Sequence, residues 1–332
     1  MIVIPSEARD LQFAVKCRSL ASLGMTKTYS PMAFKQVTII GTGLIGGSLG
    51  LALKKRHLAR RIIGCDRAPV LERAQDCGAI EAGRTNPADA VRGSDLVVLA
   101  TPVIPILDLI GRLGPTLAAK TLVTDVGSTK AQIVQRAAKS FGRNAGQRFL
   151  AGHPMAGKEH AGVEFADADL FEGAAWLFTP LPGQNVHAGQ CGEFIHCAEK
   201  MGAKIAVLDP SDHDRICAWI SHLPQMISTA LAATLVDEFG SDAPVLDVGG
   251  RALREMTRIS ASPYSMWRDI AITNRKNLSD ALQKMEQRLA HIRENLDSRE
   301  LAAEFESAHQ LRKSPSRKHG GKRIGPSDHR AT

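Results

Sequence analysis

The sequence predicts an α/β protein with an N-terminal Rossmann-type parallel-sheet domain followed by an all-helical domain. From residue 35 onward, short apolar segments alternate with longer segments of helical spacing, which is typical of a parallel sheet covered on both faces. A glycine-rich turn joins the first apolar segment to the first helix. After residue 209 the helical spacing continues without a convincing strand pattern. With 332 residues and 44% hydrophobic content, the chain is long enough for two domains.

The first domain is predicted over residues 32–209, where strands and helices alternate. One of its helices ends at Gly78, as helices often do at a glycine. The predicted strands are 36–40, 61–66, 95–102, 121–128, 148–154, 174–180 and 203–209, and the predicted helices are 46–56, 71–78, 104–117, 129–141 and 188–200.

The second domain is predicted over residues 210–311 as helices alone. Segments 212–239, 249–259 and 265–296 have apolar residues at helical spacing. Helices of this length with recurring Leu, Ile and Met usually need a partner to bury their apolar stripe, and a small domain offers few. We therefore expect this domain to form a homodimer. Its arginines, considered below, also make it the expected substrate-binding domain.

The two ends of the chain carry its excess charge. The net charge of +8 comes from residues 1–31 and 312–332, and residues 32–311 are formally neutral. We expect both ends to be disordered; the first is a leader or an over-long start, with Met32 as the working start. A nucleic-acid-binding domain would carry its charge on the folded surface, so no specific nucleic-acid partner is expected. Weak contact of the tail with RNA, DNA or acidic lipid is the alternative.

The composition also argues against a membrane span and a metal centre. No apolar run approaches the ~18 residues that a spanning helix needs. The six cysteines form no CxxC pair and no cluster with zinc spacing. Reduced thiols are typical of a cytoplasmic protein, and we expect that location and no bound metal.

The segment GTGLIGG predicts a dinucleotide-binding turn. Gly41, Gly43 and Gly46 form a GxGxxG frame that follows one strand and opens a helix. The first glycine permits the tight turn, the second lets the backbone approach the pyrophosphate, and the third lets helix and strand pack closely. The pyrophosphate would meet backbone N–H groups at the helix N-terminus, around Leu44 and Ile45.

An acidic residue completes this pattern. Asp66 lies 20 positions after Gly46, at the end of the next strand. Its carboxylate can accept hydrogen bonds from the adenosine ribose and would repel a 2′-phosphate, which favours NAD over NADP. Arg67 weakens the inference, because an arginine there could bind that phosphate.

Polar residues also gather at the ends of three later strands. These are Thr101 with Pro102, Asp125 with Ser128, and His153. Ligands of open parallel sheets bind beyond the carboxyl ends of the strands, so these side chains should lie near the nicotinamide and the substrate. A neutral imidazole with a pKa near ~6.5 can accept the proton of an alcohol as hydride leaves the same carbon. A histidine that merely caps a tight turn is the alternative for His153.

The helical domain contributes a histidine and several arginines. His222 lies two residues before Pro224 inside a helical pattern, where the proline should bend the helix and mark a pocket. A packed core histidine is the alternative. Arg254, Arg258 and Arg268 are candidates for binding an anionic substrate, and periodicity does not choose among them.

Five segments, taken together and in order, resemble the prephenate/arogenate dehydrogenase family of tyrosine biosynthesis. They are GTGLIGGSLG, TDVGSTK, GHPMAGKEHAGVEFADADLFEGAAWLFTP, SHLPQ and TRISASPYSMWRDI, and the resemblance covers residues 36–295. It implies NAD-dependent oxidative decarboxylation of prephenate to 4-hydroxyphenylpyruvate, of arogenate to tyrosine, or of both.

The same resemblance implies roles for individual residues. His153 would take the proton of the ring hydroxyl, and Ser128 would orient that histidine and contact the hydroxyl. Arg258 would hold a substrate carboxylate, and His222 would contact the substrate side chain. Glu159 would lie near the arginine and gate entry, and Trp267 would be a pocket residue near the dimer interface. Lys158, where some relatives carry threonine, leaves the choice between prephenate and arogenate open.

A β-hydroxyacid dehydrogenase is the second enzyme hypothesis, because that class also joins a Rossmann domain to a helical one. It normally uses a lysine of the helical domain as its base, and no matching motif surrounds Lys276.

Overall fold

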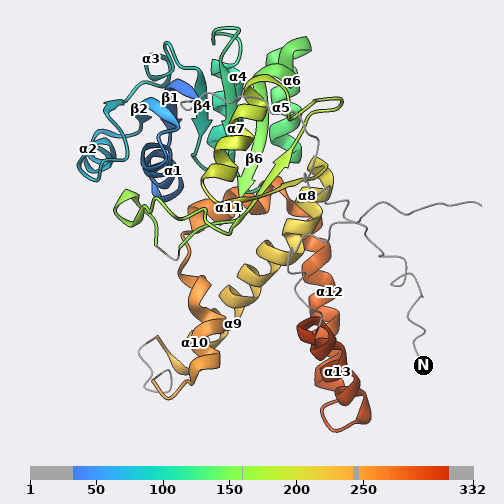
Figure 1. The fold of residues 1–332 in the computed structure, drawn as a ribbon. Helices are drawn as coiled ribbons and strands as arrows, with labels where there is room; N and C mark the ends of the chain where they lie inside the picture. The colour runs from blue at the N-terminus through green and yellow to red at the C-terminus, as the bar shows by residue number, and fades with distance from the viewer. Residues whose placement is uncertain (1–32, 159, 242–246, 314–332) are drawn as a thin grey trace, which may run out of the picture. The chain divides into compact units, whose positions relative to one another are not determined.

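The computed structural model describes residues 33–158, 160–241 and 247–313 (Figure 1). The described chain divides into one compact unit that ends at Ser279 and a second that begins at Asp280. The predictions for residues 1–31 and Glu159 lie outside the described residues, as does most of the predicted tail. Helix α13 (Arg299–Lys313) runs two residues past the predicted boundary at 311.

One sheet of eight strands organises the first unit. Its order is β3-β2-β1-β4-β5-β6-β7-β8. The strands are β1 (Phe34–Ile40), β2 (Ala59–Cys65), β3 (Ala82–Arg84), β4 (Leu96–Leu99), β5 (Leu122–Asp125), β6 (Phe149–Pro154), β7 (Ala175–Thr179) and β8 (Lys204–Val207).

The sheet is parallel from β3 through β6, and β7 departs from the prediction. It pairs antiparallel to β6, with His153 opposite Leu177, while β8 runs parallel to β7. A parallel neighbour would need a crossover that returns the chain to the starting edge, usually a helix. Between β6 and β7 the described chain has only a short 3-10 turn, η3 (Val163–Phe165), so β7 returns in the opposite direction.

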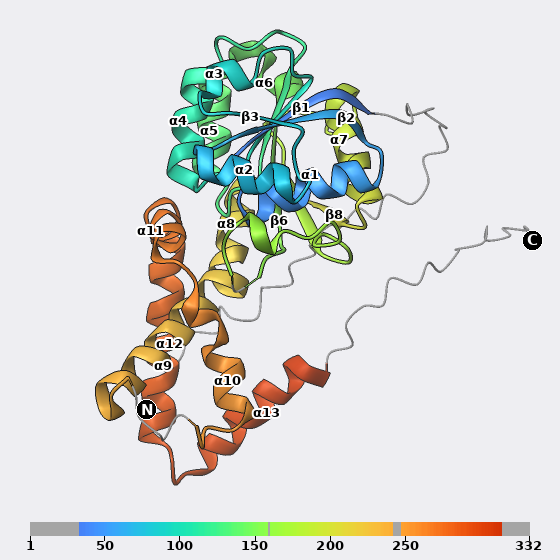
Figure 2. The ribbon, with the colours of Figure 1, turned by 90° about the vertical axis from the view of Figure 1, so that its left-hand side faces the viewer.

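Two apolar cores cover the two faces of this sheet. Helices α1 (Leu44–Lys55), α2 (Ala68–Asp76) and α7 (Gly189–Lys200) pack on one face, where Trp176, Phe178 and Phe194 form an aromatic cluster. Helices α4 (Val103–Leu113), α5 (Ala131–Phe141) and α6 (Ala145–Arg148) pack on the other (Figures 1 and 2). Strand residues alternate between the cores, as in Val98 and Leu99, because successive side chains point to opposite faces.

The predicted strands and helices of this layer are present, and several short elements escaped prediction. They include β3, α6 and α3 (Pro87–Ala90); Asn86 accepts a hydrogen bond from the Ala88 N–H and caps α3. Three or four residues are too few for a periodicity to show.

The helical part of the first unit contains α8 (Pro210–Cys217), α9 (Leu223–Phe239), α10 (Arg251–Thr257), η6 (Arg258–Ala261) and α11 (Tyr264–Thr273), and α12 (Arg275–Glu294) begins there. A π-helical turn, η4 (Ala218–His222), ends two residues before Pro224 and leads into α9. Such turns are frequent at functional sites.

Helices α8 and α11 are fixed to the sheet layer by carboxylates placed at helix N-termini. Asp214 on α8 accepts hydrogen bonds from the backbone N–H groups of Lys130 and Ala131, 2.6 and 2.9 Å away, at the start of α5. Asp269 on α11 accepts from the Ile104 N–H at the start of α4, at 3.0 Å. The unpaired N–H groups and the dipole of a helix start favour an anion, so these contacts replace caps that both helices lack in their own sequence.

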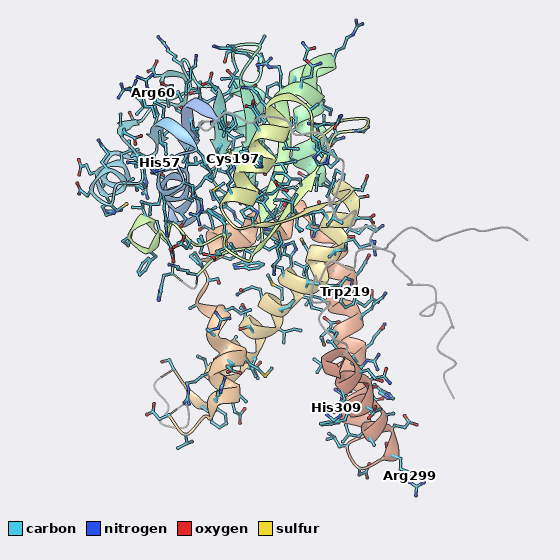
Figure 3. The ribbon with its side chains drawn as sticks, in the orientation of Figure 1. His57, Arg60, Cys197, Trp219, Arg299 and His309 are labelled. Carbon is cyan, nitrogen blue, oxygen red and sulfur yellow. The ribbon has the colours of Figure 1, made fainter. Side chains whose placement is uncertain are left out.

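The five cysteines of the described residues are free thiols. Cys197 lies on α7 between the helix and the sheet (Figure 3), where burial raises the pKa of its thiol to about 12. Among the described helices, none combines the length and the apolar character that crossing a bilayer requires.

Candidate active site

The glycine loop between β1 and α1 has the geometry that a dinucleotide needs. Gly41 has φ +95°, and a Cβ there would lie 2.5 Å from the Ala100 carbonyl oxygen, so only glycine fits. A Cβ on Gly46 would lie 1.9 Å from the Gly41 oxygen. At Gly43 a Cβ would meet nothing within 4 Å. The space beside the loop is therefore open, and a ligand can approach the protein backbone there.

The start of α1 faces this open space without a competing anion. Gly43 is the N-cap and offers no side-chain hydrogen bond, and no acidic residue stands in the first turn. Leu44 and Ile45, the first two helical residues, are half-buried. The helix N-terminus can therefore receive a phosphate through its backbone N–H groups.

Asp66 lies where the dinucleotide pattern requires an acid. It follows β2, is half-buried, and accepts a 2.8 Å hydrogen bond from the Thr42 N–H of the glycine loop. Its second oxygen accepts from the N–H of Arg67, whose side chain is exposed. Asp66 thus ties the two strand ends together and places a negative charge beside the loop.

Thr101 and Pro102 connect β4 to α4 next to the glycine loop. The Thr101 N–H would lie 2.9 Å from a Cβ on Gly41, so the two loops are in direct contact. Pro102 is the N-cap of α4 and is exposed, and Thr101 is half-buried. The ends of β1, β2 and β4 thereby form one continuous rim.

Asp125 differs from the sequence expectation, because it lies inside the protein rather than on this rim. Its side chain is fully buried and paired with the equally buried ammonium of Lys130. It also accepts from the N–H groups of Gly127 and Gly152, at 2.9 and 3.3 Å. Burial raises the pKa of Asp125 and lowers that of Lys130, while each charge opposes the shift of the other. This pair holds β5 to β6 and leaves no carboxylate surface for a cofactor.

His153 lies at the end of β6 and is 8% exposed. Its Nδ1 is 3.0 Å from Nε2 of His213 on α8. Its Nε2 has no hydrogen bond among the described residues and is not one of their fully buried unpaired atoms, so it is the reachable nitrogen. Burial, followed by His213, Lys130 and His222, lowers the pKa of His153 well below 6.5, which corrects the expected near-normal value.

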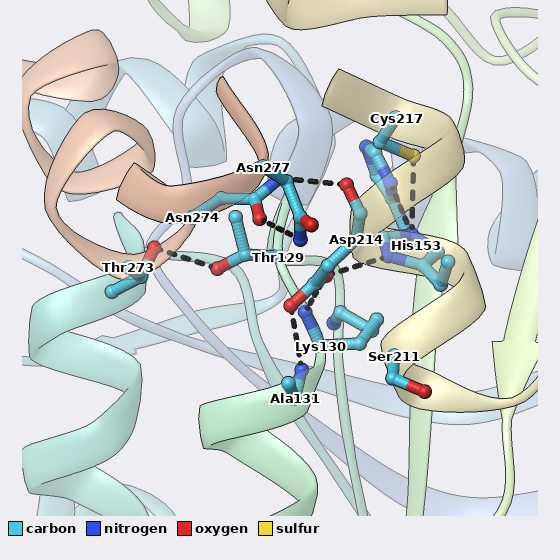
Figure 4. A network of polar contacts seen from close by, with 12 residues as sticks. Thr129, Lys130, Ala131, His153, Ser211, Asp214, Cys217, Thr273, Asn274 and Asn277 are labelled. Carbon is cyan, nitrogen blue, oxygen red and sulfur yellow. Dashed lines mark hydrogen bonds and ion pairs between the residues drawn. The ribbon is translucent and has the colours of Figure 1, made fainter. Parts of the chain in front are cut away.

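His213 and Asp214 are the functional candidates that the sequence did not reveal. Figure 4 labels Asp214, together with His153 and Cys217. Nδ1 of His213 lies 2.9 Å from the Asp214 carboxylate, which can only accept, so Nδ1 carries the proton. Burial lowers the pKa of His213, which keeps the ring neutral and its Nε2 an acceptor. The Nδ1 of His153 must then be the donor, and its Nε2 presents a lone pair. The signal in the sequence was the adjacent His213 and Asp214 near the start of a helix. It did not point to His153, because the two histidines are 60 residues apart in the chain.

Cys217 completes a buried group of possible metal ligands. Its Sγ lies 3.5 Å from His213 Nε2, and the ligand atoms of Cys217, His153 and His213 all lie within 4.8 Å of one another. A metal would need a thiolate, whereas burial raises the pKa of Cys217 to about 12. It would also have to break the hydrogen bond between the two imidazoles. We therefore assign the group to hydrogen bonding.

His222 ends the π-helical turn and is completely buried. Its Nδ1 lies 3.2 Å from the side-chain amide of Asn274, and burial lowers its pKa to about 4. Trp267 on α11 packs edge-on against it, with ring centroids 6.0 Å apart. The sequence named His222 and Trp267 as pocket residues, and the structure brings the two together within one chain.

The remaining predicted residues are spread around this cluster. Ser128 follows β5 and is half-buried, and its expected role beside His153 stays a prediction. Arg258 opens η6 and is exposed. η6 packs against α9, because Gln225 donates a 2.9 Å hydrogen bond to the Ile259 carbonyl. The residue after Arg258 is therefore hydrogen-bonded to Gln225, which follows His222 by three residues on the chain.

The chain matches two family models in sequence. Residues 49–207 match the nucleotide-binding domain of prephenate dehydrogenase, and residues 209–308 match its dimerization domain. The prephenate dehydrogenase of Lactococcus lactis is 31% identical over 290 residues, which cover 84% of this chain and 77% of that protein. The chain belongs to the prephenate dehydrogenase family.

Solved members of the prephenate dehydrogenase family have the same fold. The enzyme of A. aeolicus, solved in complex with hydroxyphenyl propionate and NAD+, superposes with a TM-score of 0.76 at 29% identity, over 85% of this chain and 99% of that one. The arogenate dehydrogenase of Synechocystis gives 0.66 at 28% identity, over 83% and 98%. The family therefore includes proteins named for either substrate, and membership removes the β-hydroxyacid dehydrogenase hypothesis.

Proposed function

We propose that this protein catalyses the NAD-dependent oxidative decarboxylation of prephenate, of arogenate, or of both. The observation that carries the proposal is the chain of hydrogen bonds from Asp214 through His213 to His153, which leaves His153 Nε2 as a neutral acceptor at the sheet rim. Family membership and the names of the relatives support the same reaction.

The residues of the rim fit a nicotinamide dinucleotide. Gly43 leaves open space, the start of α1 has no anion, and Asp66 is placed for a ribose hydroxyl pair. When bound, the cofactor would supply the hydride acceptor for the ring carbon that bears the hydroxyl. The Asp66 carboxylate favours NAD, since it would repel the additional phosphate of NADP.

In this proposal His153 moves the proton. Its Nε2 lone pair accepts the hydroxyl proton of the cyclohexadiene as hydride leaves the same carbon, so the carbon–oxygen bond gains double-bond character. The ring carboxylate then leaves as CO2, the electrons of the broken carbon–carbon bond make the ring aromatic, and the ring oxygen takes a proton back from the protonated His153, so that the product is a phenol. A positioned base of this kind contributes ~10²–10⁴-fold to a rate.

Substrate binding is assigned to the residues that the family resemblance identifies. Arg258 would hold a carboxylate, because its fork of donors matches two oxygens. Ser128 would contact the ring hydroxyl, and His222 and Trp267 would meet the substrate side chain. Glu159 would gate entry beside the arginine.

The direct experiment measures NADH formation by the purified protein given prephenate or arogenate, with NAD+ and NADP+ in parallel. We expect turnover with NAD+ and at least one of the two substrates, and much weaker turnover with NADP+. The absence of turnover with both substrates, in a protein that still binds NAD+, would contradict the proposed function.

We further propose that the protein is a cytoplasmic homodimer. The family's second domain is described as a dimerization domain, and the helical segments expose large apolar side chains. Those of the first unit include Trp219, Ile220, Val236, Phe239 and Met256 (Figure 3 labels Trp219). The buried free thiols support a reducing compartment. Light scattering during size-exclusion chromatography should give twice the chain mass.

A further inference from the structure

Two residues of α1 belong to the segment GTGLIGGSLG but have no role in the glycine loop. Gly47 and Ser48 follow the third glycine of the GxGxxG frame, and both are buried. A glycine inside a helix lowers the stability of that helix relative to alanine, so Gly47 calls for a reason in the packing. Its N–H donates to the Gly43 carbonyl at 2.8 Å, as in an ordinary helical turn. The space that a side chain of residue 47 would need is occupied by another part of the chain.

That part is the β6–β7 connection, of which residues 155–158 and 160–174 are described. A Cβ on Gly47 would lie 2.7 Å from Cγ2 of Val163 and 3.1 Å from Cβ of Ala166. Val163 belongs to η3 and is 1% exposed. The connection therefore packs directly against the backbone of α1, and the absence of a side chain at residue 47 makes this approach possible.

Polar contacts extend this packing along α1. The Asp167 N–H donates to Ser48 Oγ at 2.9 Å, and Ser48 is completely buried. Further along the helix, the Asp169 carboxylate accepts from Lys55 and Arg56, at 2.5 and 3.0 Å. Ion pairs that water can reach contribute little to stability. The buried contacts near the start of α1 should therefore contribute most to the docking of the connection.

The segment that follows His153 has few contacts of its own. The Met155 N–H still donates to β7, at 2.7 Å. Among the described residues from 156 to 161, no further backbone–backbone hydrogen bond is made. The Lys158 ammonium donates to the Asp167 carboxylate at 3.2 Å, and so joins this segment to the docked part of the connection. The position of the segment therefore depends on how η3 and Asp167 lie on α1.

We propose that Gly47 and Ser48 are positioning residues, which dock η3 and Asp167 on α1 and thereby fix the segment that follows His153. This inference rests on the proposed function and deepens it. The first turn of α1 would hold the pyrophosphate, and the next turn holds the connection. One helix would thus position both the cofactor and the backbone next to the catalytic histidine. A misplacement of ~1 Å away from the reacting atoms can lower a rate by ~10²-fold.

Gly47→Ala tests this role with the glycine loop left intact. The added Cβ must displace Val163, because the two carbon atoms cannot approach to 2.7 Å. At saturating NAD+ we expect kcat/KM for prephenate or arogenate to fall by about 10–100-fold, with Kd for NAD+ within about twofold of wild type. Gly146→Ala is the control, because its Cβ would meet nothing closer than 3.7 Å, and it should change neither value. A loss of NAD+ affinity as large as the loss of kcat/KM would show that Gly47 acts through the cofactor loop, and would overturn the proposal.

A second substitution identifies the contact. Val163→Ala removes the methyl group that the new Cβ would meet. The kcat/KM of the double variant Gly47→Ala/Val163→Ala should therefore return to within about fivefold of that of Val163→Ala alone, as expected for residues in direct contact. A double variant no more active than Gly47→Ala would overturn the assigned docking. Circular dichroism establishes that each variant is folded.

Hydrogen exchange tests the docking without turnover. Ser48→Ala leaves the Asp167 N–H without its acceptor, and Gly47→Ala displaces η3. Mass spectrometry of peptides that cover residues 163–171 should show faster exchange in both variants than in wild type and Gly146→Ala. Unchanged exchange in both variants would overturn the proposal. Lack of turnover of the wild-type protein with both substrates would instead contradict the proposed function and leave this readout intact.

Discussion

The glycine loop and the buried cluster around His153 are built in different ways. The loop is local: Gly41, Gly43 and Gly46 lie within six residues, and each has its role through backbone geometry. The cluster joins β5, β6, α8 and the end of α11, and two of the hydrogen bonds that its buried side chains make join residues 60 positions apart, His153 with His213 and Asn274 with Asp214. The loop offers open space to a ligand, whereas the cluster has most of its polar atoms already paired.

This difference explains why the two regions respond differently to substitution. A change in the loop acts through sterics, so its effect depends on what a new Cβ meets. A change in the cluster acts through unpaired charges and protons, so its effect depends on which partner is left behind.

The largest effect is expected from His153→Asn in the cluster. Asparagine retains a polar group but cannot accept the hydroxyl proton, so kcat/KM should fall by about 10³-fold. The glycine loop is untouched, and NAD+ affinity by fluorescence titration should match that of wild type. Retained turnover with normal NAD+ binding would show that another group is the base.

The next effect concerns stability. Lys130→Met leaves the buried carboxylate of Asp125 without its cation, and removing one partner of a buried ion pair costs about 3–5 kcal/mol. The double variant Lys130→Met/Asp125→Asn removes the unpaired charge and should recover part of this loss. Urea denaturation measures both, and equal stability of the single variant and wild type would contradict the assigned pair.

Two alanine substitutions in the loop should separate ligand binding from folding. Gly43→Ala adds a Cβ into open space, so the melting temperature should stay the same while KM for NAD+ rises by about 10–100-fold. Gly46→Ala places a Cβ 1.9 Å from the Gly41 oxygen, so the loop must shift and melting temperature should fall as well. Calorimetry with cofactor kinetics distinguishes them. An unchanged KM for NAD+ in Gly43→Ala would show that the pyrophosphate does not bind beside Gly43.

A smaller effect is expected from His213→Leu. Leucine cannot accept the Nδ1 proton of His153, so the imidazole loses its imposed tautomer and orientation. We expect kcat to fall about tenfold with little change in KM, and the pH profile to shift. Cys217→Ala is the control, because it removes only a 3.5 Å thiol contact from the same ring and should change kcat by less than about threefold. Equal losses in both variants would indicate a packing role.

The sequence predicts those features whose cause is local. The strand–glycine–helix segment, Asp66 and the position of His153 at a strand end follow from spacing and alternation, and the structure places them at one rim. Strand β7 is antiparallel to β6 because the described chain between them has no crossover helix. The apolar pattern of a strand does not show its direction. Asp125 was expected at the rim because ligands bind beyond the carboxyl ends of parallel strands, but its side chain is buried in an ion pair with Lys130, five residues later. His213 could not be linked to His153, since only the fold brings α8 to the end of β6.

The central claim is that a buried, neutral imidazole, oriented by Asp214 through His213, takes the substrate proton. Its most direct test is the pH dependence of kcat/KM for the preferred substrate at saturating NAD+, because this parameter reports the pKa values of the free protein. Since burial lowers the pKa of His153, its base form persists to lower pH than an ordinary histidine would allow. We predict that kcat/KM stays level as pH falls to about 6.5 and declines only below it. This acidic limb of the pH profile should be absent in His153→Asn. A limb centred at or above about 6.5, or one that survives in His153→Asn, would contradict the account.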